Sequence, residues 1–90
     1  MEIVYIEMDD KHQKIMRYES FSSLLSATEW IREHIATFFE DEPKYVEVLN
    51  TKTIEELGLL LDHTYGWGRD DMRCVYVLRV NDAGEFEEIF

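Results

Sequence analysis

The spacing of the apolar residues changes along the chain, and these changes restrict the fold to one that combines strands with helices. Residues 3–8 form a β-branched and aromatic run that is apolar on both faces, which predicts a central strand covered on both sides. Residues 14–18 follow a polar turn and predict a second strand, so the chain begins with a hairpin. From Phe21 to Phe39 the apolar residues recur at helical spacing, which predicts a helix packed on the sheet.

Capping residues indicate where this helix begins and ends. Ser26 and Glu29 have the spacing of a capping box, and one short turn can precede it because three earlier serines are alternative caps: Ser20, Ser22 and Ser23. Pro43 predicts the end of the helix, because the residue before a proline is pushed out of the α region.

The second half of the chain predicts a further helix between strands. Residues 44–50 are rich in Tyr and Val, which favours a third strand, although the short segment leaves a helix open. Thr53 and Glu56 form a capping box, and Gly66 can end the helix that follows. Gly58 lies inside this helix, where its missing side chain predicts a close neighbour. The chain ends in a predicted hairpin built from residues 72–80 and 85–90.

These elements predict an α+β two-layer domain of order ββαβαββ, with about five strands in a mixed or antiparallel sheet and two helices on one face. The 90 residues fit a single domain, residues 1–90. Cys74 is the only cysteine, which excludes an internal disulfide and favours a reducing, cytoplasmic location. No signal peptide pattern and no run of about 18 apolar residues is present, so we expect no membrane association.

No local pattern predicts catalysis, a metal site or a cofactor. The three histidines, His12, His34 and His63, stand in no recognised signature, and we expect His34 to be half-buried and hydrogen-bonded. Cys74 sits in a strand pattern, which is typical of a small buried apolar residue. A catalytic cleft would have to gather His63, an aspartate at 70 or 71, and Cys74 from separate places. We therefore expect a protein that is not an enzyme and that holds no metal or cofactor.

Acidic residues outnumber basic ones by 20 to 9, which gives a net charge of −11. Such a charge argues against direct binding to nucleic acid and favours a basic protein as partner. Solubility alone needs only about 2 to 8 charges on a small domain. The candidate partner-binding residues are Glu40, Asp41, Glu42, Asp70, Asp71, Asp82, Glu85, Glu87 and Glu88, with Glu29 and Glu33 as further outward acids.

Trp67 or Phe90 is the candidate apolar contact, and tryptophan between two glycines in a loop is typical of an interface anchor. The alternative is that Trp67 folds back over the end of the core.

The composition therefore predicts a small acidic protein that binds and inhibits a basic partner, one whose own ligand is nucleic acid. In size and charge the chain resembles the inhibitors that phages and mobile elements make against host defence proteins, including DNA mimics, although no motif supports the likeness. An immunity protein or antitoxin that neutralises a cognate toxin is an alternative. A homo-oligomeric structural or adaptor module is another, because Ile89 and Phe90 could leave an apolar strand edge.

Overall fold

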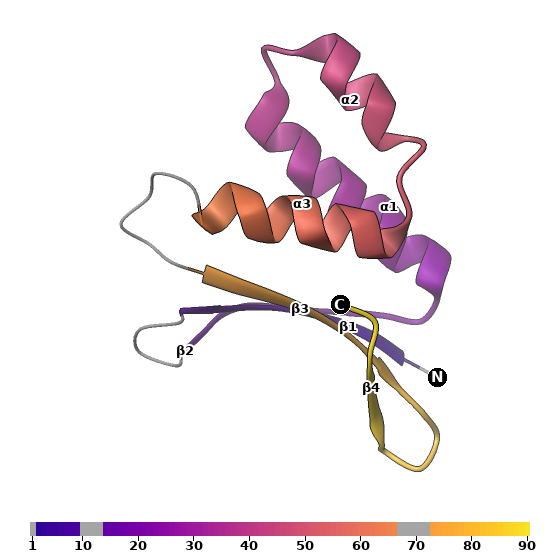
Figure 1. Cartoon of the computed structure of the whole chain (residues 1–90). Helices are drawn as coiled ribbons and strands as arrows, with labels where there is room; N and C mark the ends of the chain where they lie inside the picture. Colours follow the sequence, from indigo (N-terminus) through magenta and orange to yellow (C-terminus); the bar gives the residue numbers. More distant parts are fainter. Residues whose placement is uncertain (1, 10–13, 67–72) are drawn as a thin grey trace.

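The fold is an antiparallel sheet with helices packed on it (Figure 1). The computed structural model describes residues 2–9, 14–66 and 73–90. In chain order the elements are β1 (Glu2–Asp9), β2 (Lys14–Phe21), α1 (Leu24–Ala36), the 3-10 turn η1 (Thr37–Phe39), α2 (Pro43–Leu49), α3 (Ile54–Gly66), β3 (Arg73–Val80) and β4 (Phe86–Glu88). The described strands are ordered β2-β1-β3-β4, and each neighbouring pair is antiparallel. The predicted α+β class is confirmed, with four strands and three α-helices described instead of about five strands and two helices.

The prediction of a strand over residues 44–50 is wrong, because this segment forms α2. Pro43 occupies the first turn, where its fixed φ favours a helix and its missing N–H is not needed. Tyr45 and Leu49 are spaced by four residues and turn inward, so that Leu49 is fully buried and Tyr45 packs against Phe39 with ring centroids 4.5 Å apart. Packing against the first helix thus overrides the strand preference of Tyr and Val.

The helices that the structure describes all lie on one face of the sheet (Figure 1). Side chains alternate along β1, so Ile3, Tyr5 and Glu7 point toward the helices, whereas Val4, Ile6 and Met8 point to the opposite face. The buried cluster lies between the two layers and consists of Ile3, Tyr5, Ala27, Ile31, Ile35, Leu49, Ile54, Leu57, Leu61, Val75 and Val77. No helix covers the second face of β1 in the described structure, but Val4 on that face is only 2% exposed, so the expected cover on both sides is present in part.

The N-terminal cap of α3 is the one that the sequence predicts, and that of α1 agrees with the sequence in part. Ser23 caps α1, accepting a hydrogen bond from the amide of Ser26 at 3.1 Å, so the helix begins earlier than the Ser26 capping box. At α3 the predicted box is present, since Thr53 and Glu56 exchange backbone-to-side-chain hydrogen bonds of 3.2 and 3.3 Å.

Gly58 admits a close neighbour, as predicted. A Cβ placed on Gly58 would stand 2.9 Å from the ring of Phe90, which packs beneath α3. Ile89 and Phe90 are held along β3 by hydrogen bonds with the backbone of Val77, at 2.8 to 3.1 Å. The turn before β4 is the expected tight one, with Gly84 at a φ of 80°, a conformation that suits glycine.

Candidate functional site

A buried carboxylate lies at the centre of the sheet. Glu7 on β1 is fully buried. Its Oε1 atom accepts one hydrogen bond from the Tyr5 hydroxyl at 2.6 Å and pairs with His34 Nε2 at 3.0 Å. Its Oε2 atom accepts a hydrogen bond from Arg73 at 3.3 Å and lies 3.7 Å from the Nε atom of Arg17. One carboxylate therefore joins three strands and the first helix.

Aromatic rings cover this cluster. Trp30 stacks on the imidazole of His34, with centroids 4.9 Å apart and an interplanar angle of 15°. Phe38 meets the imidazole edge-on, and the guanidinium of Arg17 lies 5.9 Å from the centre of the Trp30 ring. His34 is 16% exposed and hydrogen-bonded, which confirms the prediction made for it.

The arrangement suits a structural anchor better than an open reaction centre. Each oxygen of Glu7 already faces donors supplied by the chain itself, which is how a buried charge is compensated. Among the described residues, no group of three or more His, Cys, Asp or Glu side chains could hold a metal ion.

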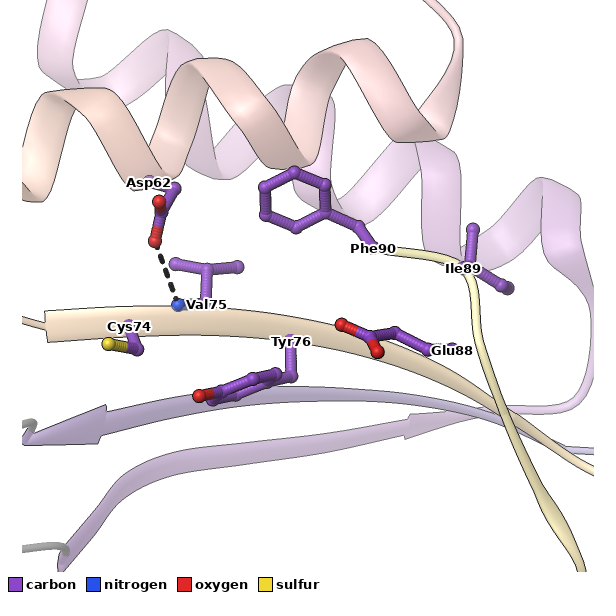
Figure 2. Close-up of a pocket in the computed structure, with 7 residues that line it drawn as sticks. All are labelled: Asp62, Cys74, Val75, Tyr76, Glu88, Ile89 and Phe90. Carbon is purple, nitrogen blue, oxygen red and sulfur yellow. Dashed lines mark hydrogen bonds between the residues drawn. The ribbon is translucent and has the colours of Figure 1, made fainter.

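A hollow of about 530 Å³ opens between α3, β3 and the C-terminal segment (Figure 2). Its described lining residues are Asp62, Cys74, Val75, Tyr76, Glu88, Ile89 and Phe90. Asp62 reaches down from α3 and accepts a hydrogen bond from the Val75 amide at 3.2 Å, because β4 pairs with β3 only at Leu78, Arg79 and Val80. The described lining of the hollow includes no histidine.

Cys74 is only partly buried, whereas the sequence predicted a buried residue. Its proposed companions at 70 and 71, and the side chain of His63, lie outside the part of the chain that the structure describes. The same holds for Trp67, so neither interpretation of that residue is decided.

The predicted partner-binding acids do not gather on one surface. Glu40, Asp41 and Glu42 are exposed in the turn between η1 and α2, on the side of the helical layer away from the sheet (Figure 1). The others are exposed in and beside the β3–β4 hairpin, at the opposite end of the molecule: Asp82, Glu85, Glu87 and Glu88. The two groups therefore could not contact the same small site.

The first group continues along α1. Glu29 and Glu33 are exposed, and spacings of four and seven residues place Glu29, Glu33 and Glu40 along one side of the helix and the turn that extends it. We call the surface formed by Glu29, Glu33, Glu40, Asp41 and Glu42 the acidic ridge. None of these five makes an ion pair with another described residue.

The hairpin acids are different, because Glu87 pairs with Arg79 at 3.6 Å. Lys52 likewise pairs with Glu56 at 3.6 Å, and both Arg17 and Arg73 face Glu7. Most basic side chains in the described chain thus neutralise acids outside the acidic ridge.

The sequence pattern predicted neither the Glu7 cluster nor the sheet face that carries no helix. Glu7 was detectable, because a single carboxylate within a strand of apolar residues needs buried partners. The C-terminal pair was also misjudged, since Ile89 and Phe90 pack against the core and do not leave an apolar edge.

Among the described residues, no helix combines the length and the hydropathy that crossing a membrane requires. Comparisons of the chain with protein-family models, with curated proteins and with solved structures find no match.

Proposed function

We propose that the protein is a non-enzymatic binding protein whose acidic ridge attaches to a basic partner protein and blocks it. The observation that carries the proposal is the row of five exposed carboxylates without ion pairs to described residues, in a chain whose basic side chains mostly serve other acids. Such a surface attracts a cationic patch over about a Debye length and accelerates the encounter.

The ridge also opposes the stability of the fold, which favours a role in binding. Glu29 and Glu33 are like charges four residues apart on α1, an arrangement that destabilises a helix by about 0.2 to 0.5 kcal/mol. The acids at 40–42 precede α2, whose N-terminus favours negative charge, so they have a partial structural reason. Glu29 and Glu33 lie within α1 and gain nothing from that effect.

The partner that suits this surface is a nucleic-acid-binding enzyme, because carboxylates can occupy sites that receive phosphates. An inhibitor of host defence from a phage or mobile element, acting as a DNA mimic in the cytoplasm, would have this chemistry. An immunity protein or antitoxin has the same physical basis and stays the second candidate.

Binding kinetics with two matched triple variants test the proposal. Glu33→Gln/Glu40→Gln/Glu42→Gln and Glu55→Gln/Glu85→Gln/Glu88→Gln each remove three charges, the first from the ridge and the second from elsewhere. We expect the ridge variant to associate with the captured basic partner about tenfold more slowly at low salt, and the other variant to change little. Added salt should slow the wild type.

Equal effects of the two triple variants, or an association rate independent of salt, would contradict the proposal. Competition with nucleic acid then distinguishes a DNA mimic from an immunity protein. A DNA mimic should be displaced from its partner by DNA or RNA, whereas an immunity protein bound away from the cleft should remain bound.

A further inference from the structure

In the described structure no helix covers the face of the sheet opposite α1, α2 and α3 (Figure 1). The register places Ile6, Tyr18 and Tyr76 side by side across β2, β1 and β3, with Leu78 and Phe86 continuing the surface toward β4. Figure 2 shows the alternation directly, with Val75 pointing toward α3 and Tyr76 pointing the other way. We call this surface the open face.

The open face departs from the usual pattern of a one-sided antiparallel sheet. Such a sheet normally alternates apolar residues inward with polar residues outward. Here Tyr18 is 54% exposed and Phe86 69% exposed, and Ile15 on the same face is 54% exposed. Contiguous apolar surface of this kind marks an interaction site.

We propose that the open face binds the open face of a second copy of this chain, forming a symmetric dimer with two packed sheets. The surface is poor in charge although the chain carries −11, so a basic partner would find few carboxylates there. A second copy offers an equally apolar surface, and sheets pack face to face at about 10 Å. The proposal does not depend on the function assigned to the acidic ridge.

The area is near the lower limit for a specific dimer. Three strands of 8 residues and one of 3 make up the face. At about 3.4 Å per residue and about 4.8 Å between strands, the flat footprint is roughly 450 Å² per copy, or about 900 Å² for the pair. Because side chains project from this flat footprint, the accessible area buried by the pair is larger and approaches the roughly 1,000 Å² that a specific interface needs.

The positions of the acids select one arrangement of the two copies. Glu2 and Glu88 are the acids on the open face, and the register places both at the end of the sheet that holds Leu78 and Val80. Among the residues that the structure describes, the opposite end, at Met8 and Cys74, carries no acid on this face. A two-fold axis that runs across the strands lays the acidic end of one copy over the apolar end of the other, and so avoids the repulsion of like charges.

Sedimentation or light scattering over a range of protein concentrations tests the dimer, using two pairs of variants matched for exposure. Tyr18→Lys and Phe86→Lys lie on the open face, whereas Leu59→Lys, at 51% exposure, and Leu25→Lys, at 68%, lie on helices. Every variant adds one positive charge, so general charge effects cancel within a pair. Circular dichroism checks that each variant folds.

We expect a reversible dimer that salt strengthens, because salt screens the repulsion between two acidic copies. Tyr18→Lys and Phe86→Lys should each raise the dissociation constant about tenfold or more, and the helix variants should leave it within about twofold. The dimer should persist in reductant, because the axis places the two Cys74 residues at opposite ends.

A monomer at all concentrations and salt strengths would overturn the proposal. So would a dimer lost on Leu59→Lys or Leu25→Lys but retained in the open-face variants, or a dimer that reductant dissolves. The opposite salt dependence expected for partner binding keeps a failure here separate from a failure of the acidic ridge.

Discussion

The carboxylate of Glu7 and the imidazole of His34 meet at 3.0 Å between the central strand β1 and the first helix α1. This contact joins two segments 27 residues apart in the chain and places a charge inside the core.

Glu7→Gln should therefore destabilise the protein strongly. The substitution removes the buried charge that Tyr5, His34 and Arg73 contact, and hydrogen bonds to a charged group are worth about 1.5 to 3 kcal/mol each at most, a value reduced here because the side chains of Arg17 and Arg73 are 44% and 27% exposed. Urea unfolding measures the loss. Glu87→Gln is the control, because its pair with Arg79 has a carboxylate that is 72% exposed, and we expect a change within about 0.5 kcal/mol. Similar losses in the two variants would show that Glu7 is not an anchor.

The capping box of α3 should give the stability a local dependence on pH. The backbone amide of Thr53, and then its hydroxyl, donate hydrogen bonds to Glu56 and hold the pKa of that carboxyl below its ordinary value of 4.5. A lowered folded-state pKa stabilises the fold above the unfolded-state pKa, and this contribution is lost as the pH falls through the folded-state value. Glu56→Gln should flatten the decline in unfolding free energy below about pH 4.5.

Glu55→Gln is the matched control for this pH dependence, because it removes a carboxylate from the same helical turn and no hydrogen bond with Thr53. An equal flattening by both variants would trace the effect to overall charge and not to the capping box.

Gly58→Ala should destabilise the protein, although alanine is the better helix former by about 1 kcal/mol. The new Cβ would meet the Phe90 ring at 2.9 Å, and overpacking of this kind costs about 1 to 3 kcal/mol. In a Phe90→Ala background the obstruction is gone, so the same substitution should stabilise by up to about 1 kcal/mol. Thermal unfolding of the four proteins in this cycle gives the sign, and a substitution that stabilises both backgrounds would refute the close contact.

Glu33→Lys should raise stability while it weakens partner binding. It replaces a repulsive pair with Glu29 by an attractive pair at the same four-residue spacing, a change of about 0.4 to 1 kcal/mol. Urea unfolding at low and high salt is the measurement, and the gain should shrink as salt screens the charges. A gain that is unchanged at high salt would mean that helix propensity, and not charge, is responsible.

The sequence predicted well what local rules control. Three correctly predicted features depend on residues close together in the chain or on a single missing side chain. They are the helix that begins with the Thr53–Glu56 capping box, the terminal hairpin and the space at Gly58. These local rules failed for residues 44–50, because the segment carries two conflicting signals. Strand-forming Tyr and Val competed with a proline at the helix start, and burial of Leu49 against α1 decided in favour of the helix.

The sites were harder to foresee, because they need distant segments. Glu7, His34 and Arg73 are far apart in the sequence, and no spacing rule joins them before the strands are paired. The open face depends on which side of the sheet the helices take. Alternation in β1 is apolar on both sides, so the sequence could show that both faces bury well but not that one is left uncovered.

The hydrogen bond from the Val75 amide to Asp62 sets the direction in which the sheet could grow. Beyond the end of the short β4, the Asp62 side chain of α3 accepts the hydrogen bond that the Val75 amide donates. An additional strand would need this amide, so strand addition is blocked at that point on β3. β2 is the edge strand on the other side of the sheet, and no hydrogen bond of this kind is seen there in the described structure. We therefore expect Asp62→Ala to release the Val75 amide and to make this part of β3 available to a pairing strand.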